Sequence, residues 1–359
     1  MELMEDGTTI EQQMFAMATE KKVPLYGVLE LLPLCNLNCD MCYVRMSREE
    51  MEEWTKTAED MMRAGTLFVL LTGGEPLLYP HFRELYQKLR ELGMIITINT
   101  NGTLIDEAWA DFFAENKPRR INITLYGASN ETYERLCHYP GGFDKAVNGI
   151  RLLRERNIDV KVNGSLAKAN VDDRMKIIEL GESLDAPVRI DTYMYPSVRE
   201  RNHAYNNQAR LDPEMAAKAR VEVLQREMGE EVFAQYRKIQ LDEAENTPEG
   251  EAVPGQMACR AGKSSFVVNW QGEMRSCVVL DKPSIPLRNV EFEEAWKFTK
   301  KETESLRISA RCSSCKLRKV CNTCVAAAIA ETGKADGVPE YLCRYTEATV
   351  RYLKETSKK

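Results

Sequence analysis

Histidines and long apolar runs are scarce in this sequence of 359 residues, and an excess of basic residues is absent. Lysine and arginine total 49 against 55 acidic residues, a net charge of -6, so no basic surface for nucleic acid is expected. The first residues are acidic and lead into no long apolar stretch, which argues against a signal peptide and a membrane span. We therefore predict a cytoplasmic protein. The three histidines, at 81, 138 and 203, have no second imidazole at ligand spacing, so histidine-based zinc catalysis has no support.

Cysteine, by contrast, is abundant, with 11 residues in two groups. Three lie at 35–42, seven lie at 259–343, and Cys137 stands alone. Disulfides do not persist in a reducing compartment, where grouped cysteines are more often metal-binding or catalytic. The two groups predict at least two cluster-binding regions.

The first group is Cys35, Cys39 and Cys42, at the spacing C-x3-C-x2-C. Three thiolates hold three corners of a cubane iron–sulfur cluster and leave the fourth iron free to bind a small molecule. A zinc knuckle is the alternative, but structural zinc takes four ligands and the next cysteine is Cys137. The spacing resembles the signature of the radical S-adenosylmethionine (SAM) enzymes, in which the open iron chelates SAM and the reduced cluster cleaves it to a 5'-deoxyadenosyl radical. Met41 stands where that family usually has an aromatic residue.

Short apolar runs alternate with helical patterns through the first 198 residues. The predicted strands are 25–32, 66–71, 94–99, 120–125, 158–166 and 188–195, and the predicted helices between them are 47–64, 81–92, 106–116, 143–156 and 172–184. Parallel strands with right-handed helical crossovers are the economical arrangement of this pattern. Six units fall short of a closed eightfold barrel, so we predict an α/β fold with a partial (β/α)6 barrel, which the resemblance also implies. Site residues are then expected at the C-terminal ends of the strands.

Glycine-rich and polar segments follow the second, third and fourth predicted strands. Residues 73–76 match the GGEP motif of radical SAM enzymes, and 124–127 are similar to the Ser-Leu-Asp/Tyr-Gly segment that lines their SAM pocket. The SAM contacts that we predict from these segments are Gly73, Gly74, Glu75, Asn99, Asn101, Thr124 and Tyr126. Plain Gly-Pro and Asn-Gly turns are the alternatives at 73–76 and 99–102.

Polar side chains also alternate along the last two predicted strands, as Asn163 and Ser165, then Arg189, Asp191, Tyr193 and Tyr195. Alternate residues share one face of a strand. Asn163 and Ser165 are further candidate SAM contacts. Facing the barrel interior, Arg189 and Asp191 would bind substrate or the SAM carboxylate, and facing a helix or solvent they would be structural. Cys137 is either a hydrogen donor to a substrate radical, as in some radical enzymes that invert a stereocentre, or a buried inert thiol.

Composition divides the chain into four parts. Residues 1–22 form a polar, helix-prone lead, and 23–198 form the barrel. A polar and helical linker at 199–254 contains a charged helix at 213–245, which we predict to be a solvated bridging helix, and the boundary is placed near Pro254. Residues 255–359 form a small cysteine-rich module that ends in a helix at 338–352.

The seven cysteines of this module resemble the SPASM module, which carries auxiliary four-iron clusters behind the barrel of radical SAM enzymes that modify peptides and proteins. One spacing departs, because two residues rather than three separate Cys321 from Cys324. The resemblance implies an outer cluster on Cys312, Cys315, Cys321 and Cys343 and an inner cluster on Cys259, Cys277 and Cys324. Two fully ligated cubanes need one more thiolate, so the inner cluster would keep an open iron for a non-cysteine ligand or a substrate thiolate. Zinc ribbons are the alternative.

These features predict a radical SAM enzyme that modifies a ribosomal precursor peptide, with SAM and three four-iron clusters as cofactors. The open auxiliary iron favours a thioether or another cross-link as the product, and flavodoxin or ferredoxin would be the reductant. Only 34 residues precede Cys35, so we expect the leader of the peptide to be held by a separate protein, by the barrel edge or not at all. The alternatives are a peptide epimerase or oxidase, a sulfatase-maturating enzyme, a small-molecule dehydrogenase and a non-catalytic electron carrier. Val278 disfavours sulfatase maturation, because those enzymes have a catalytic Asp there.

Overall fold

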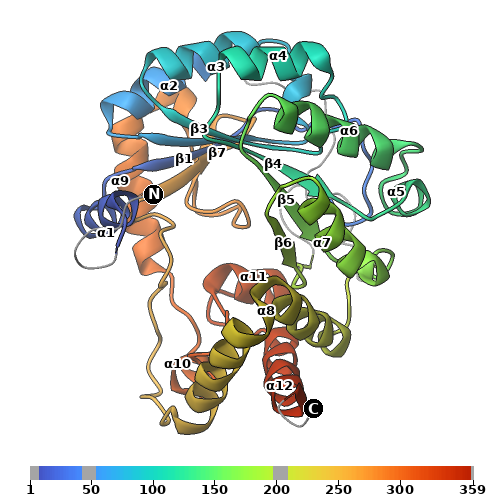
Figure 1. Cartoon of the computed structure of the whole chain (residues 1–359). Coiled ribbons are helices and arrows are strands. Elements are labelled where there is room, and N and C mark those ends of the chain that lie inside the picture. Colours follow the sequence, from blue (N-terminus) through green and yellow to red (C-terminus); the bar gives the residue numbers. More distant parts are fainter. Residues whose placement is uncertain (1–7, 43–53, 197–208, 357–359) are drawn as a thin grey trace.

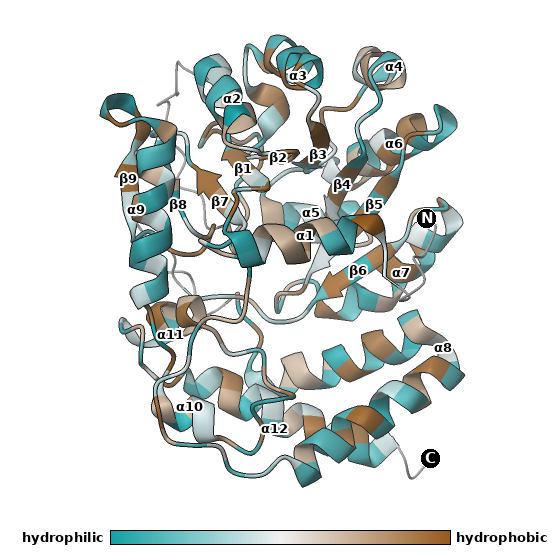
Figure 2. Cartoon of the chain, turned by 90° about the vertical axis from the view of Figure 1, so that its left-hand side faces the viewer, coloured by the Kyte–Doolittle hydropathy of each residue, from teal (hydrophilic) through white to brown (hydrophobic). Residues whose placement is uncertain are grey.

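The computed structural model describes residues 8–42, 54–196 and 209–356. Within these residues the strands form one sheet in the order β6-β5-β4-β3-β2-β1-β7-β8-β9 (Figures 1 and 2). Neighbours from β1 to β6 are parallel and are joined by helical crossovers, so the predicted α/β architecture is confirmed. The bounds are β1 Tyr26–Glu30, β2 Phe68–Thr72, β3 Ile95–Thr100, β4 Arg120–Leu125, β5 Val160–Ser165 and β6 Val188–Asp191.

The crossover helices cover the outer face of these strands (Figure 1). They are α2 Trp54–Arg63, α3 Phe82–Glu91, α4 Glu107–Glu115, α6 Gly142–Glu155 and α7 Arg174–Ser183, and single 3-10 turns lie at Pro76–Leu78 and Val171–Asp173. Their apolar faces bury Trp54, Phe82, Tyr86 and Phe113 completely against the sheet. The part of the first predicted helix before Trp54 lies outside the described residues.

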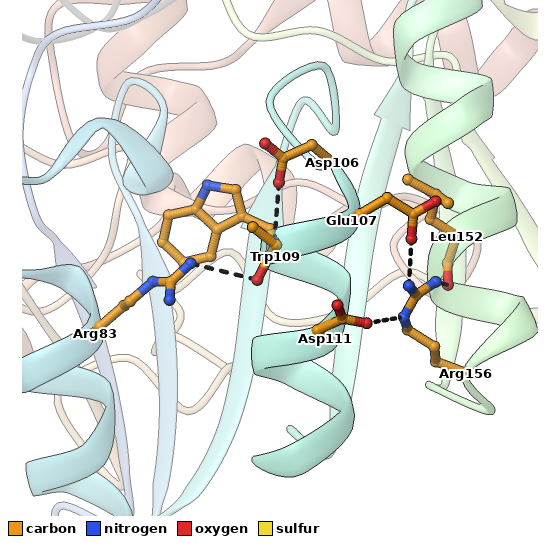
Figure 3. A network of polar contacts seen from close by, with 8 residues as sticks. Arg83, Asp106, Glu107, Trp109, Asp111, Leu152 and Arg156 are labelled. Atoms are coloured by element: carbon orange, nitrogen blue, oxygen red, sulfur yellow. Dashed lines mark hydrogen bonds and ion pairs between the residues drawn. The ribbon is translucent and has the colours of Figure 1, made fainter.

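Polar contacts brace the outer helices to one another (Figure 3). Arg156, at the end of α6, forms ion pairs with Glu107 and Asp111 of α4, the latter at 2.7 Å. Arg83 of α3 lies over the ring of Trp109, with its guanidinium carbon 4.6 Å from the centroid. Such exposed ion pairs are screened by solvent and contribute little to stability. These contacts hold α3, α4 and α6 together on the outside of the barrel.

Two segments of the barrel differ from the prediction. Helix α5 (Asn130–Cys137) lies between β4 and α6, where the apolar pattern predicts no helix; it begins because the Ser129 side chain caps the Thr132 N–H at 3.2 Å. Strand β6 ends at Asp191 and not at residue 195. The chain leaves the sheet there, and the hydroxyl groups of Thr192 and Tyr345 lie 2.9 Å apart, which ties this segment to a C-terminal helix.

The sheet continues past the boundary predicted near Pro254. β7 (Ser265–Val268) pairs in parallel with β1, and β8 (Glu273–Arg275) and β9 (Ser284–Pro286) follow in antiparallel order, with a 3-10 turn at Leu287–Asn289. Gly27 permits the close approach of β7, since a Cβ on it would lie 2.8 Å from the Phe266 ring. Helix α9 (Phe292–Ser305) covers this extension, and its Phe292 packs edge-on against Phe266. The first strands after Pro254 therefore belong to the barrel sheet.

The N-terminal lead contains helix α1 (Ile10–Lys21), which covers the N-terminal ends of β1 and β2. Thr9 and Gln12 form a reciprocal capping box at its start. Phe15 stacks on Phe68 with the ring centroids 5.1 Å apart, and the guanidinium carbon of Arg260 lies 4.0 Å from the centroid of the Phe15 ring. The lead thus closes the end of the barrel opposite the strand ends where site residues are expected.

The remaining helices lie below the barrel as a C-terminal layer (Figures 1 and 2). They are α8 Pro213–Asn246, α10 Ala310–Ser314, α11 Val325–Thr332 and α12 Glu340–Glu355. The prediction of a solvated bridging helix needs correction, because Val221, Leu224 and Phe233 of α8 are buried in one cluster with Leu353 of α12. Gly229, with φ +73°, breaks α8 into two arms, so the segment is not one straight helix.

Candidate functional site

A cavity of about 760 Å³ lies where the C-terminal ends of the barrel strands face the C-terminal layer. Most of the predicted site residues line it, namely Cys35, Cys39, Cys42, Gly73, Gly74, Asn99, Asn101, Thr124, Tyr126, Ser165, Arg189 and Asp191. Across the cavity stand Val278, Val279 and Asn322, which neighbour cysteines of the C-terminal module. The cavity is therefore walled by both cysteine regions of the chain.

The first cysteine group occupies the loop after β1. The Leu37 N–H donates to Cys35 Sγ at 3.4 Å, and the Asn101 amide donates to the same sulfur at 3.7 Å. Burial is the main reason that the pKa of the Cys35 thiol is raised to about 12. The hydrogen bond from the Leu37 N–H lowers this pKa, and the neighbouring Glu75, Cys39 and Cys42 raise it. Three thiolates packed this deeply need a cationic group between them, so the donor set fits an iron–sulfur cluster.

In the described part of the chain, no three His, Cys, Asp or Glu side chains lie close enough together to hold a single metal ion. A cubane takes each thiolate at a different iron, which sets the sulfurs wider apart than the ligands of one ion. The assignment of Cys35, Cys39 and Cys42 to a cluster rests on their sequence spacing and on the burial of Cys35.

Helix α5 holds the cysteine loop from behind. The Asn38 N–H donates to the Cys137 carbonyl at 3.0 Å, and His138 pairs with Asp40 at 2.7 Å. A hydrogen bond with Cys137 and burial raise the pKa of Cys39. Cys137 is fully buried and is absent from the described lining of the cavity, so its place favours the packed thiol over the hydrogen donor.

The glycines after β2 let two backbone segments touch. A Cβ on Gly74 would lie 2.2 Å from the Leu34 carbonyl oxygen, and one on Gly73, where φ is +143°, would lie 2.6 Å from the Leu32 oxygen. The Gly74 N–H instead donates to the Leu32 carbonyl at 2.7 Å. Only glycine allows this ladder to join the loop of Cys35 to the end of β2.

Glu75 connects three loops from a fully buried position. Its carboxylate accepts hydrogen bonds from the Thr100 hydroxyl at 2.7 Å, the Asn101 N–H at 2.8 Å and the Leu77 N–H at 3.2 Å. Burial raises its pKa from 4.5 to about 7, against these three donors. The described lining of the cavity does not include Glu75, so its predicted contact with the SAM amino group remains a prediction, and what the geometry supplies is the positioning of Asn101.

The other predicted contacts differ in depth. Asn101 also donates to the Asn36 side chain at 2.9 Å, and Asn99 accepts from Asn122 at 2.8 Å, which fixes both amides at the cavity wall. Ser165 lies at the end of β5 and lines the cavity. Asn163 lies two residues earlier in the strand and is absent from the described lining.

The end of β6 supplies a charged pair. Arg189 and Asp191 form an ion pair at 3.2 Å, with side chains more than half exposed, and both line the cavity. Tyr193 and Tyr195 line it as well, although they lie beyond the strand. All four lie at one site, but alternation is not the reason beyond Asp191, because Thr192 and Met194 line the cavity too. Sequence reasoning missed Thr72, Arg220 and Tyr345 in the lining; Thr72 ends a strand, which was an available signal, whereas the other two lie on distant helices.

The seven module cysteines form two sets in space. Burial raises the pKa of Cys277, and the nearby Cys324 and Cys259 add to the shift. Burial likewise raises the pKa of Cys343 to about 11, with contributions from Glu340, Cys321 and Cys312, and Cys312 in turn interacts with Cys315 and Cys321. These are the inner and outer sets that the resemblance implies. Which cofactor each set holds remains a prediction.

Backbone donors reach several of these sulfurs. The Val279 N–H donates to Cys277, the Leu317 N–H to Cys315 and the Ala327 N–H to Cys324, each at 3.4 Å. Such donors favour thiolates, which fits metal ligation in both sets. Among the described helices, none combines the length and the apolar character needed to cross a membrane.

Residues 29–181 match the radical SAM superfamily. The chain is 24% identical over 323 residues to the AdoMet-dependent heme synthase of Methanosarcina barkeri, covering 85% of this chain and 92% of that protein. It is 25% identical to the subtilosin biosynthesis protein AlbA of Bacillus subtilis, over 74% of this chain and 57% of AlbA. It is 27% identical to the PqqA peptide cyclase of Rhodopseudomonas palustris, over 54% of this chain and 52% of that protein.

Among solved structures, Streptococcus suis SuiB bound to S-adenosylmethionine shares the fold, with a TM-score of 0.68 at 17% identity over 92% of this chain and 81% of SuiB. SuiB is also known bound to the precursor peptide SuiA. The GGEP segment, the cysteine triad and the match over residues 29–181 together establish the class: the barrel contains a radical SAM domain, and the protein is a radical SAM enzyme. The alternative of a non-catalytic electron carrier is therefore set aside.

Proposed function

We propose that this enzyme modifies a ribosomal precursor peptide by abstracting hydrogen from one of its residues, with a thioether or another cross-link as product. The observation that carries the proposal is a cavity that the SAM-side triad lines and whose opposite wall includes Val278 and Val279, which follow Cys277 of the inner set in the sequence. A substrate held there would contact the triad on one side and the residues that follow Cys277 on the other, so hydrogen abstraction and the removal of a second electron would occur close together. The similarity to AlbA, the PqqA peptide cyclase and SuiB supports a peptide substrate.

On this proposal Cys35, Cys39 and Cys42 hold a four-iron cluster whose open iron binds SAM. Reduced cluster and SAM together supply a 5'-deoxyadenosyl radical. Asn99 and Asn101, fixed by their own hydrogen bonds, are placed to bind polar groups of SAM without reorganising. Glu75 holds Asn101 from below, and the ion pair of Arg189 with Asp191 presents charge to substrate at the rim.

Cross-linking requires that the electrons balance. Joining a thiol sulfur to a carbon removes two hydrogens from the peptide: one leaves as an atom to the deoxyadenosyl carbon, the other as a proton plus an electron. The inner set, Cys259, Cys277 and Cys324, adjoins the far wall, because Val278 and Tyr195 line the cavity and the Tyr195 hydroxyl lies 4.0 Å from Cys324, and an auxiliary cluster held there would accept that electron. With three thiolates, the set leaves one position for a substrate sulfur, which coordination would deprotonate.

A second candidate, modification of an iron porphyrin, is favoured by the length of the match to the heme synthase. Porphyrin substrates carry several carboxylates, which call for several cationic partners. In the described part of the lining the cations are Arg189 and Arg220, and Arg189 is already paired with Asp191. This charge balance supports the peptide over the porphyrin.

The test uses the full chain, reconstituted anaerobically with iron and sulfide and supplied with SAM and dithionite. Two substrates are compared, the cysteine-containing peptide encoded nearest to its gene and an iron coproporphyrin. We expect 5'-deoxyadenosine in both assays and a peptide product lighter by two hydrogens, seen by mass spectrometry. A converted porphyrin beside an unchanged peptide would overturn the proposal in favour of the second candidate.

A further inference from the structure

Tyr195 lies between the cavity and the inner cysteine set. Its ring follows the end of β6 and lines the cavity, and its hydroxyl oxygen is 4.0 Å from Cys324 Sγ, within hydrogen-bond range for sulfur. The Tyr193 ring packs edge-on against it, with the centroids 5.1 Å apart. Tyr195 therefore touches the barrel site on one side and the module on the other.

The position of Cys324 at the start of α11 favours its thiolate form. It is the N-cap of α11, where its sulfur accepts the Ala327 N–H at 3.4 Å. A helix start favours an anion, since its first N–H groups point outward. Once Cys324 is a metal-bound thiolate it has no proton to give, and a phenol keeps its own near neutral pH. The hydroxyl of Tyr195 must then be the donor in this contact.

Hydrogen bonds to ligating sulfurs change the properties of the metal group. They withdraw electron density from the thiolate, which makes an iron–sulfur cluster easier to reduce. Cys277, by comparison, receives its donor from the backbone N–H of Val279, which a side-chain substitution leaves in place. The Tyr195 hydroxyl is thus a side-chain donor to the inner set that can be removed by itself.

We infer that Tyr195 is a positioning residue that donates a hydrogen bond to the Cys324 thiolate and raises the reduction potential of the inner auxiliary cluster. The inference rests on the proposed function, because it takes the inner set to hold a cluster. Tyr195 therefore connects the wall of the cavity to the cluster that accepts the electron from the substrate. Its hydrogen bond sets the reduction potential of that cluster.

The experiment measures the reduction potential of the auxiliary clusters by electron paramagnetic resonance. It uses the full chain with Cys35, Cys39 and Cys42 all replaced by Ala, so that the SAM cluster does not obscure the spectrum. Tyr195→Phe should lower the potential of one cluster. Tyr193→Phe is the matched control, because the Tyr193 hydroxyl donates its hydrogen bond to Glu331 at 3.4 Å, and it should leave the potential unchanged.

A second variant covers the case in which Tyr195→Phe fails to assemble. Site-specific 3-fluorotyrosine at position 195 keeps the ring and makes the hydroxyl a stronger donor, so the potential should rise. Equal potentials in all of these chains would overturn the inference. The iron and sulfide contents of two further variants distinguish failure of this inference from failure of the proposed function. If neither Cys277→Ala nor Cys324→Ala lowers the iron and sulfide contents, the inner set holds no cluster and the proposed function fails.

Discussion

The loop of Cys35, Cys39 and Cys42 and the inner set of Cys259, Cys277 and Cys324 are held in different ways. The loop is anchored by the backbone ladder that Gly73 and Gly74 permit, by the end of α5 and by Asn101, which Glu75 fixes. The inner set is assembled from three separate segments, and its sulfurs receive donors from nearby N–H groups and from Tyr195.

The difference suggests a division of labour. A loop tied to the sheet keeps an open iron at one place relative to the SAM-binding strand ends. A set gathered from separate segments leaves a coordination position beside the substrate. Changes near the loop should therefore affect stability and SAM cleavage together, whereas changes near the inner set should separate SAM cleavage from product formation.

The largest expected effect comes from removing one thiolate from each region. Cys39→Ala should abolish SAM cleavage, because the two thiolates that remain are too few to hold the SAM cluster. Cys324→Ala should keep uncoupled cleavage and lose the peptide product, because the second electron has no acceptor. The measurement is 5'-deoxyadenosine by chromatography beside product by mass spectrometry. Equal cleavage by wild type and Cys39→Ala would break the comparison.

Gly74→Ala should come next, because the added Cβ meets the Leu34 backbone and not a movable side chain. We expect a loss of about 3 kcal/mol in the free energy of unfolding, as for overpacking at a rigid site, together with lower iron content. Gly93→Ala is the control: φ is +76°, but within 4 Å no described atom would meet the new Cβ, so only about 1 kcal/mol of backbone strain is expected. Urea denaturation measures both, and equal losses would contradict the packing argument.

Glu75→Gln should destabilise the protein by about 1–3 kcal/mol, because one carboxylate oxygen becomes a donor that faces other donors. The effect should depend on pH. The folded-state pKa of about 7 lies above the ordinary 4.5, so the contribution of Glu75 is fully present below 4.5 and is lost as the pH rises through about 7. The difference in urea midpoint between wild type and Glu75→Gln should shrink over that range; a difference that grows would contradict the assigned burial.

Arg189→Ala should have the smallest effect on stability, below about 1 kcal/mol, because the pair with Asp191 is exposed. It should nevertheless raise KM for the peptide, since both residues line the cavity. Arg120→Ala breaks a comparable exposed pair with Asp159 at the start of β4 and should leave KM unchanged. The same KM in both variants would assign Arg189 to a structural role.

The barrel was predictable from the sequence because apolar residues occur in short runs or at alternate positions along the strands, and β4, whose buried residues alternate, has the bounds that its pattern predicts. The strands β7 to β9 were not predicted, because a run of three or four residues shows too little periodicity to distinguish a strand from a loop. The burial of one side of α8 also escaped, since its apolar residues face a helix more than a hundred residues later.

The site divides in the same way. Motif spacing located the cysteines, the glycines and the alternating residues from Arg189 to Tyr195, all of which line the cavity or form the two module sets. It could not foresee that Thr100 and Asn101 bond to the Glu75 carboxylate, since that depends on how two loops meet. Cys137 followed a strand and became a candidate, yet α5 buries it.

The most direct test of the account is the iron and acid-labile sulfide content of anaerobically prepared protein, compared with two chains that each lack one cysteine set. The account predicts three four-iron clusters in the intact chain, a loss of one when Cys35, Cys39 and Cys42 become Ala, and a separate loss of one when Cys259, Cys277 and Cys324 do. Stoichiometric zinc without sulfide, or iron that does not change between the chains, would contradict it.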